Sequence, residues 1–230
     1  MNIKNTLLAS AAILAAASSA SAIEIKMGNA NGSDVGYFRA NPHGAFESVI
    51  DNYAMGKSTD GTWFGTFCIE KAEFFNPGAT YDVALNDGAV SGGNGGAVNG
   101  KDIISEGTGW LYEQYAIGAF FQSAFSTLNL QNAIWFLEDE HGWGSLTANG
   151  QSLVAFAASS LGFATNDPTW ADLKADYTGR NVKVMNLPRN NGTSQHQDQL
   201  VYMPVPDTGS TLALLGFATV GLLAYRRRQS

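Results

Sequence analysis

The sequence predicts an α+β fold: a β-rich domain with a helical insertion, followed by one C-terminal transmembrane helix. Three observations lead to this prediction. Aromatic and alternating segments occur before and after the middle of the chain, apolar residues recur at helical spacing within the middle, and an apolar run lies near the C-terminus. Strands, then helices, then strands are typical of a helical unit packed against a sheet. No internal repeat is evident.

Residues 1–22 have the pattern of a secretory signal peptide. Lys4 is followed by an apolar stretch over 7–17, and the small residues Ala20 and Ala22 flank Ser21. We expect cleavage after Ala22, which leaves 23–204 as one exported globular domain. With 45% hydrophobic and 11% aromatic residues in the whole chain, this domain can bury a sizeable core.

The predicted strands lie at both ends of the exported domain. Residues 62–70, TWFGTFCIE, are aromatic-rich with a two-residue alternation, and TYDVAL over 80–85 follows as a second strand. The glycine-rich residues 86–100 predict a flexible loop, and Asn149-Gly150 is one of several pairs suited to tight turns. Strands return over 181–187 and 198–203.

Helices are predicted between these strands. One begins past Gly109 and continues through Phe121. The next has Ser126 as N-cap and places Leu130, Ile134 and Leu137 on one face. Two more cover about 150–164 and 167–177, the last with Asp167 as its cap and Pro168 in its first turn.

The C-terminal residues 205–230 combine a short peptide, an apolar run and a basic cluster. Thr211–Tyr225 is 15 residues long, about 22 Å of helix against a hydrocarbon core of about 30 Å. We expect a marginal transmembrane helix over 210–225, with Arg226, Arg227 and Arg228 as the membrane stop on the cytoplasmic side. A packed core helix is the alternative. The peptide of Val205, Pro206, Asp207, Thr208 and Gly209 does not favour helix or strand, so it stays accessible.

This segment, VPDTGSTLALLG, resembles the VPDSG variant (VPDSG-CTERM) of the PEP-CTERM sorting signal, with Thr208 where the variant usually has Ser. The resemblance implies that residues 205–209 are a sorting motif and that an exosortase, a membrane enzyme, is a partner. It also implies an anchor that is at least transient, after which the protein reaches the cell envelope surface or an extracellular matrix.

Cys68 is the single cysteine, so an exported chain cannot use it for an internal disulfide. It is an inert buried thiol, an intermolecular partner, or a functional group. A buried structural thiol fits an aromatic strand well.

A second resemblance bears on Cys68. The order of FCIE, NPGATYDV, WLYEQYA, LQNAIW and a closing LVYM strand resembles the thioester (TQXA) domains of bacterial surface adhesins. The resemblance implies a thioester between Cys68 and Gln131, with Ala133 and Trp135 as packing residues of the motif. Leu130 replaces the family's Thr, which removes a hydroxyl near the reacting carbonyl. A similar fold without the bond is the alternative. A thiolate that attacks a Gln carboxamide expels ammonia and leaves an electrophile that an amine can open.

Several other kinds of site are not favoured. The exported residues 23–205 hold 9 Lys and Arg against 19 Asp and Glu, a net charge of −10, so nucleic acid is not an expected partner. Glu138 and His141 form one i, i+3 pair, too few ligands for a metal, and a solvated acidic helix end is the preferred interpretation. Calcium at the loop acids stays open, because they and nearby asparagines could supply oxygens. The EF-hand and glycine-rich repeat spacings are absent, however, and flexible turn chemistry explains these residues equally well. The acids are Asp82, Asp87 and Asp102. We expect no metal and no cofactor.

Together these features predict a non-enzymatic, exported surface or matrix protein that is adhesive or structural. Its ligand would be an extracellular polysaccharide or an amine-bearing surface molecule. The Cys68–Gln131 thioester is one route by which the protein would bind it. The main alternative is a carbohydrate-binding module that stacks sugars on exposed tryptophans; the candidates are Trp63, Trp110, Trp143 and Trp170. A secreted hydrolase is the third hypothesis for the function.

Overall fold

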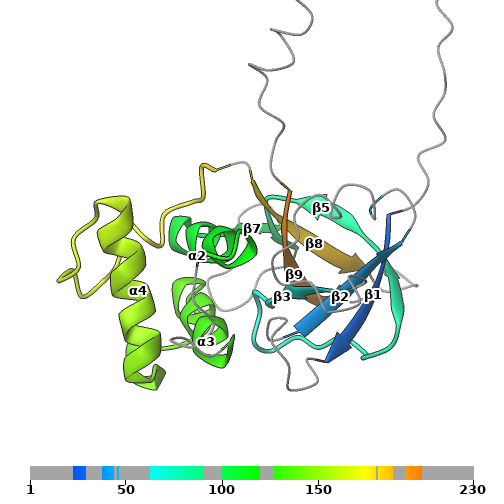
Figure 1. Cartoon of the computed structure of the whole chain (residues 1–230), viewed down its shortest axis with the longest axis horizontal. Coiled ribbons are helices and arrows are strands. Elements are labelled where there is room, and N and C mark those ends of the chain that lie inside the picture. The colour runs from blue at the N-terminus through cyan, green and yellow to red at the C-terminus, as the bar shows by residue number, and fades with distance from the viewer. Residues whose placement is uncertain are drawn as a thin grey trace, which may run out of the picture.

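The computed structural model describes residues 23–29, 38–43, 46, 63–90, 100–119, 127–179, 181–188 and 195–203. The described part is mixed α and β, with three α-helices and antiparallel sheets. The helices lie on one side of the strands (Figure 1). In chain order they come between the strand at 101–103 and the strand at 182–188, so the predicted order of strands, helices and strands is confirmed. The expected signal peptide with Ala20 and Ala22, the sorting motif and residues 210–225 with the arginine cluster all lie outside the described residues.

The outer layer is a four-stranded antiparallel sheet in the order β3-β2-β1-β4. Its strands are β1 (Glu24–Asn29), β2 (Phe38–His43), β3 (Phe64–Thr66) and β4 (Thr80–Asp82). The strand predicted over 62–70 is therefore shorter than expected. Residues 80–85 are divided at Val83, because β4 pairs with β1 whereas the next strand joins another sheet.

The middle layer is a three-stranded sheet in the order β5-β8-β9. It contains β5 (Ala84–Asn86), β8 (Val182–Pro188) and β9 (Gln195–Tyr202), with an irregularity in the β8–β9 register between Met185 and Leu187. A separate hairpin pairs β6 (Gly88–Val90) with β7 (Lys101–Ile103). The loop prediction over 86–100 is thus wrong for 88–90, since these residues pair with 101–103.

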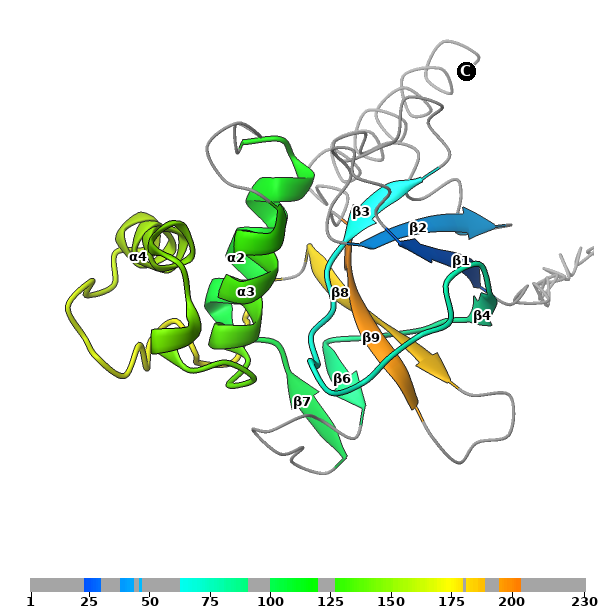
Figure 2. The ribbon, with the colours of Figure 1, turned by 90° about the horizontal axis from the view of Figure 1, so that it is seen from below.

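Side chains of the middle sheet contribute to two hydrophobic cores, one on each face. Met185, Leu187 and Val201 pack with apolar residues of the four-stranded sheet, whereas Val184 and Leu200 pack with those of the helices. Side chains of neighbouring strand residues point to opposite faces, so one sheet supplies both cores. Figure 2 shows β8 and β9 between the helices and β1–β4.

Helix α2 (Glu106–Ala116) begins earlier than the sequence predicts, and it ends before Phe121. Ser105 is its N-cap, and the Ser105 side chain accepts a hydrogen bond from Thr108 N. Gly109 lies inside this helix. A Cβ at this position would be 2.3 Å from the ring of Tyr177, so only glycine fits there without a shift. The glycine therefore permits close packing and does not mark the helix start.

Helices α3 (Thr127–Leu137) and α4 (Ala148–Leu161) confirm two predicted helices. The predicted apolar face of α3 is buried, and its expected cap, Ser126, lies outside the described residues. A short 3-10 turn, η1 (Trp143–Ser145), joins the two helices. Thr147 caps α4, so Asn149-Gly150 is in its first turn and the tight-turn prediction for this pair is wrong.

The prediction of a helix over 167–177 is wrong, because turns and bends occupy most of this range. Asp167 does act as a local cap, since its Oδ1 accepts hydrogen bonds from Thr169 N and Oγ1. Trp170, however, has φ of 56°, a left-handed conformation that a helix does not allow. Its ring is buried and stacks on Trp143 with centroids 5.0 Å apart, so tertiary packing overrides the local pattern.

Candidate functional site

The site begins where the chain leaves β3 and runs beside β9. Ile69 N donates to Asp198 O at 3.1 Å, and Leu200 N donates to Phe67 O at 3.0 Å. Cys68 lies opposite Gln199 in an antiparallel bridge. Residues 67–69 thus extend the middle sheet by one short segment, whose other edge needs partners for the N–H and C=O of Cys68.

Gln131 of α3 supplies both partners. The Cys68 backbone N–H donates to Gln131 Oε1 at 3.0 Å, and Gln131 Nε2 donates to the Cys68 carbonyl oxygen at 2.7 Å. The thiol also donates to Oε1, with Sγ 3.3 Å from that oxygen. Both side chains are 0% exposed. The structure therefore brings together the two residues that the thioester resemblance pairs, although they are 63 positions apart.

The other motif residues lie around this pair. Ala133 is fully buried in the core beneath α3, and Leu130 is buried in the same core. Leu130 thus contributes apolar packing at the position where the resembled domains have Thr. Trp135 is partly exposed and contacts His141 edge-on, with ring centroids 5.7 Å apart.

Burial dominates the electrostatics of the thiol. Burial raises the pKa of Cys68 well above its usual value; hydrogen bonds from its own backbone and from Trp135 lower it by less, and the negative charges of Glu70 and Glu140 raise it. Cys68 therefore stays a neutral thiol at physiological pH unless a nearby group takes its proton.

A cluster of three polar residues, Lys71, Glu140 and His141, adjoins Trp135. Lys71 Nζ is 3.1 Å from His141 Nε2 and 5.9 Å from the centre of the Trp135 ring. Lys71 N donates to Glu140 Oε2 at 3.4 Å. Burial and the neighbouring Lys71 charge lower the pKa of His141, which favours a neutral imidazole.

Glu70, which sequence reasoning did not single out, is the most unusual group near the thiol. It is 2% exposed, and neither carboxylate oxygen has a hydrogen bond of normal geometry within the described part of the chain. Burial, followed by the charges of Asp198 and Glu73, raises the pKa of Glu70 to about 9. Its two-residue spacing from Cys68 is not a sufficient signal, because residues 64–70 are all buried and the chain bends at Ile69.

The acids considered for metals have other roles. Glu138 is buried, so its interpretation as a solvated helix end is wrong: Glu138 Oε1 accepts from Ser105 N at 3.0 Å and Ser105 Oγ at 2.7 Å, next to the start of α2. Asp87 pairs with Lys101 and Lys183. Over the described residues, no group of three or more His, Cys, Asp and Glu side chains could hold a metal ion.

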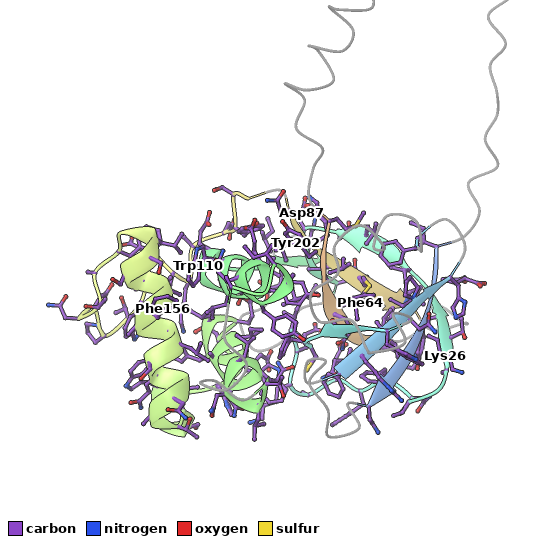
Figure 3. All side chains as sticks on the ribbon, viewed as in Figure 1. Lys26, Phe64, Asp87, Trp110, Phe156 and Tyr202 are labelled. Atoms are coloured by element: carbon purple, nitrogen blue, oxygen red, sulfur yellow. The ribbon has the colours of Figure 1, made fainter. Side chains whose placement is uncertain are left out.

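The four tryptophans proposed for sugar stacking are not equivalent. Trp170 is buried beneath Trp143 and cannot present a face to a ligand, so that part of the prediction is wrong. Trp63 lies against the guanidinium of Arg39. Trp110 meets Phe156 across α2 and α4, with ring centroids 5.6 Å apart, and Phe156 is 50% exposed (Figure 3).

Comparison with known protein families finds one match, at the C-terminus. Residues 204–229 match the VPDSG-CTERM motif, which confirms the sorting signal that the sequence predicts. The motif indicates an exported cell-surface protein that is processed by an exosortase. No curated protein and no solved structure matches the chain.

Within the described residues, no helix is both long enough and apolar enough to cross a bilayer.

Proposed function

We propose that this protein is a non-enzymatic surface or matrix adhesin whose exported domain forms an internal thioester between Cys68 and Gln131. The contact between the two buried side chains carries the proposal: Sγ lies 3.3 Å from Oε1, and Cys68 N–H binds the same oxygen at 3.0 Å. Held in this way, the thiol and the carboxamide need little further ordering before they react.

The hydrogen bonds favour the proposed chemistry. Attack of sulfur on the Gln131 carbonyl carbon places negative charge on Oε1, where the Cys68 backbone N–H already donates. An N–H aimed at a developing oxyanion stabilises the transition state. The C–N bond then breaks, Nε2 leaves as ammonia with the thiol proton, and an acyl thioester remains.

Burial at this position also suits the product. A thioester is lost by hydrolysis, and two fully buried side chains are shielded from water. An amine of a surface ligand could open the bond to give an amide between that ligand and residue 131. Such a covalent bond would hold the cell surface to its partner, which fits the exported location that the sorting motif indicates.

Intact-mass measurement of the protein released from the cell surface tests the proposal. We expect a mass lower by one ammonia, which Cys68→Ala restores and which methylamine treatment replaces with a methylamine adduct. The same spectrum reports whether the residues after the sorting motif have been removed. A full mass, together with a Cys68 that is alkylated after unfolding, would rule the thioester out.

Carbohydrate binding is the second candidate. The exposed Phe156 beside Trp110 gives an aromatic surface on α2 and α4, and aromatic rings at a surface favour sugar contacts. The rings meet at 67° instead of forming one flat platform, so this surface supports the function less well than the Cys68–Gln131 contact does.

A further inference from the structure

The four-stranded sheet has an outer face that turns away from the core. Side chains alternate along β1 and β2, so Ile25, Met27 and Ala40 pack in the core, and Lys26 and Arg39 lie on the opposite face. Figure 2 shows β1–β4 on the far side of β8 and β9 from the helices, and Figure 3 shows Lys26 on that side. The outer face therefore belongs to neither core.

This face holds the two cations that the described part of the chain does not neutralise. Six Lys and Arg side chains lie within the described residues. Three are in salt bridges, and Lys71 Nζ lies 3.1 Å from an imidazole nitrogen. Only Lys26 and Arg39 have neither an ion pair nor a side-chain hydrogen bond within these residues. The exported residues hold 19 acids against 9 bases, so a missing acidic partner is unexpected for an arginine.

Arg39 is held in place by its neighbours. Its Cζ lies 4.5 Å from the centre of the Trp63 ring, and the register places Arg39 opposite Gly28. A Cβ at Gly28 would lie 3.0 Å from Arg39 Nε and 3.2 Å from Trp63 Cζ3. Glycine therefore lets both side chains lie close to β1. A guanidinium stacked on a ring keeps its N–H groups in its own plane, where an anion can accept from them.

The side chain of Arg39 has unused hydrogen-bonding capacity. Its Nε is buried and has no hydrogen-bond partner within the described residues, although the residue as a whole is partly exposed. Polar groups of this kind call for an explanation. Lys26 is diagonal to Arg39 across β1 and β2, and such positions are about 7 Å apart. The two cations are thus close enough to meet one anionic chain.

The acids of the outer face lie at its other end. Glu24 is opposite Asp82, and it is four residues from Gly28, about 13 Å along the strand. Lys26 lies midway, and no ion pair within the described residues joins it to either acid. Exposed charges farther apart than about 8 Å are largely screened at physiological salt. These acids therefore do not prevent an anion from binding at Arg39.

We propose that Arg39 and Lys26 bind the carboxylates of an acidic polysaccharide, a polymer of uronic acid sugars. Arg39 takes one carboxylate through its N–H fork, and Lys26 attracts a neighbouring carboxylate as a point charge. Trp63 and Gly28 position the guanidinium. The exported location that the sorting motif indicates gives the site access to extracellular polymers.

The number of cations favours this ligand over an anionic membrane. Segments that bind anionic lipids carry clusters of about 4–8 Lys and Arg, whereas this site has two in a domain with a net charge of −10. Recognition here depends on the geometry of one arginine fork. The site is on different elements from Cys68 and Gln131, so it goes beyond the proposed thioester and needs no covalent chemistry.

Affinity electrophoresis of the protein released from the cell surface tests this proposal. Native gels contain polygalacturonate, neutral dextran or polyglutamate, and we expect retardation by polygalacturonate alone. Arg39→Gln should raise the Kd about 10- to 100-fold, the usual effect of losing hydrogen bonds to a charged group. Arg39→Lys should give an intermediate loss, because it keeps the charge without the fork. Lys101→Gln is the matched control: it changes the net charge equally, lies on β7, and should keep the wild-type Kd.

Each outcome supports or overturns the site. Equal mobility of the wild-type protein in polygalacturonate and dextran overturns it. Equal retardation by polyglutamate overturns the sugar ligand in favour of an acidic peptide. If Arg39→Gln shows no cooperative thermal unfolding, Lys26→Gln decides: weaker binding supports the site, and an unchanged Kd overturns it. Cys68→Ala should bind as the wild type does, so loss of the thioester and loss of this site are distinguishable.

Discussion

At the scale of single residues, Gln131 has a structural role whether or not it reacts. Its carboxamide binds both the N–H and the C=O of Cys68, as a neighbouring strand would. Loss of ammonia would remove the Nε2 bond but keep an oxygen near the Cys68 N–H. The contact therefore serves the fold before condensation and the thioester after it.

Replacing Gln131 in a Cys68→Ala background separates the structural role from the chemistry. There no thioester can form, yet the backbone of residue 68 still needs its two partners. We expect Gln131→Ala to lower the free energy of unfolding by about 2–4 kcal/mol relative to Cys68→Ala alone, since each unsatisfied buried group costs about 1–3 kcal/mol. Urea unfolding of both variants measures the difference. A change within about 0.5 kcal/mol, as at ordinary surface positions, would contradict this role.

At the scale of elements, the position of α2 depends on close contact with the turn region that follows α4. Glu106 N donates to Ala175 O, Gly107 N donates to Leu173 O, and Tyr177 N donates to Ile104 O. The first turn of α2 therefore gains backbone partners from residues 173–177. A glycine at position 109 lets the Tyr177 ring lie directly on the helix.

Adding a methyl group at position 109 tests this contact. The new Cβ would lie 2.3 Å from Tyr177 Cδ2, so the ring or the helix must move. Overpacking of this kind costs about 1–3 kcal/mol, and we expect Gly109→Ala to lower the free energy of unfolding by that amount. Gly142→Ala is the matched control, because nothing lies within 4 Å of its Cβ position. Equal stability of the two variants in denaturant would show that Tyr177 yields without cost.

Local patterns in the sequence predict some of these elements well. The Leu130, Ile134 and Leu137 face predicts α3, and the strands predicted over 181–187 and 198–203 are present as β8 and β9. The failed helix over 167–177 depends on the stacking of Trp170 on Trp143. The start of α2 depends on Tyr177 and Leu173. Contacts between distant segments decide these cases, and a local pattern does not contain them.

The residues of the candidate site also depend on contacts between distant segments more than on local patterns. Cys68 and Gln131 could be paired only through resemblance to a known domain, because nothing local joins positions 63 apart. The two-residue spacing between Cys68 and Glu70 does not predict the burial of Glu70, because the chain bends at Ile69 and residues 64–70 are all buried. Its burial depends on how β9 and the turn after β3 pack, so that feature requires the structure.

At the scale of the whole molecule, the fold buries several carboxyl groups: Asp198 on β9, Glu138 just after α3 and Glu70 after β3. Burial raises the pKa of Asp198 and of Glu138 to about 7 in each case, despite hydrogen bonds that lower it, and the pKa of Glu70 to about 9. These groups bind protons more tightly when folded than when unfolded, where their pKa values are about 4. Their contribution to stability is therefore present in acid and is lost as pH rises through about 7 to 9.

Thermal unfolding as a function of pH tests this arrangement. We expect a higher melting temperature at about pH 5.5 than at about pH 8, because the buried carboxyls take up protons on folding. His141 acts in the opposite sense, since its lowered pKa reduces stability as pH falls, but it is one group against four carboxyls with raised pKa values, Asp102 included. Below about pH 4, the salt-bridged Asp87, whose pKa is lowered mainly by Lys183, loses its contribution and stability falls again. The combined variant Asp198→Asn and Glu138→Gln should flatten the rise between pH 8 and pH 5.5, whereas an equal slope in this variant would show that these two carboxyls do not cause the pH dependence.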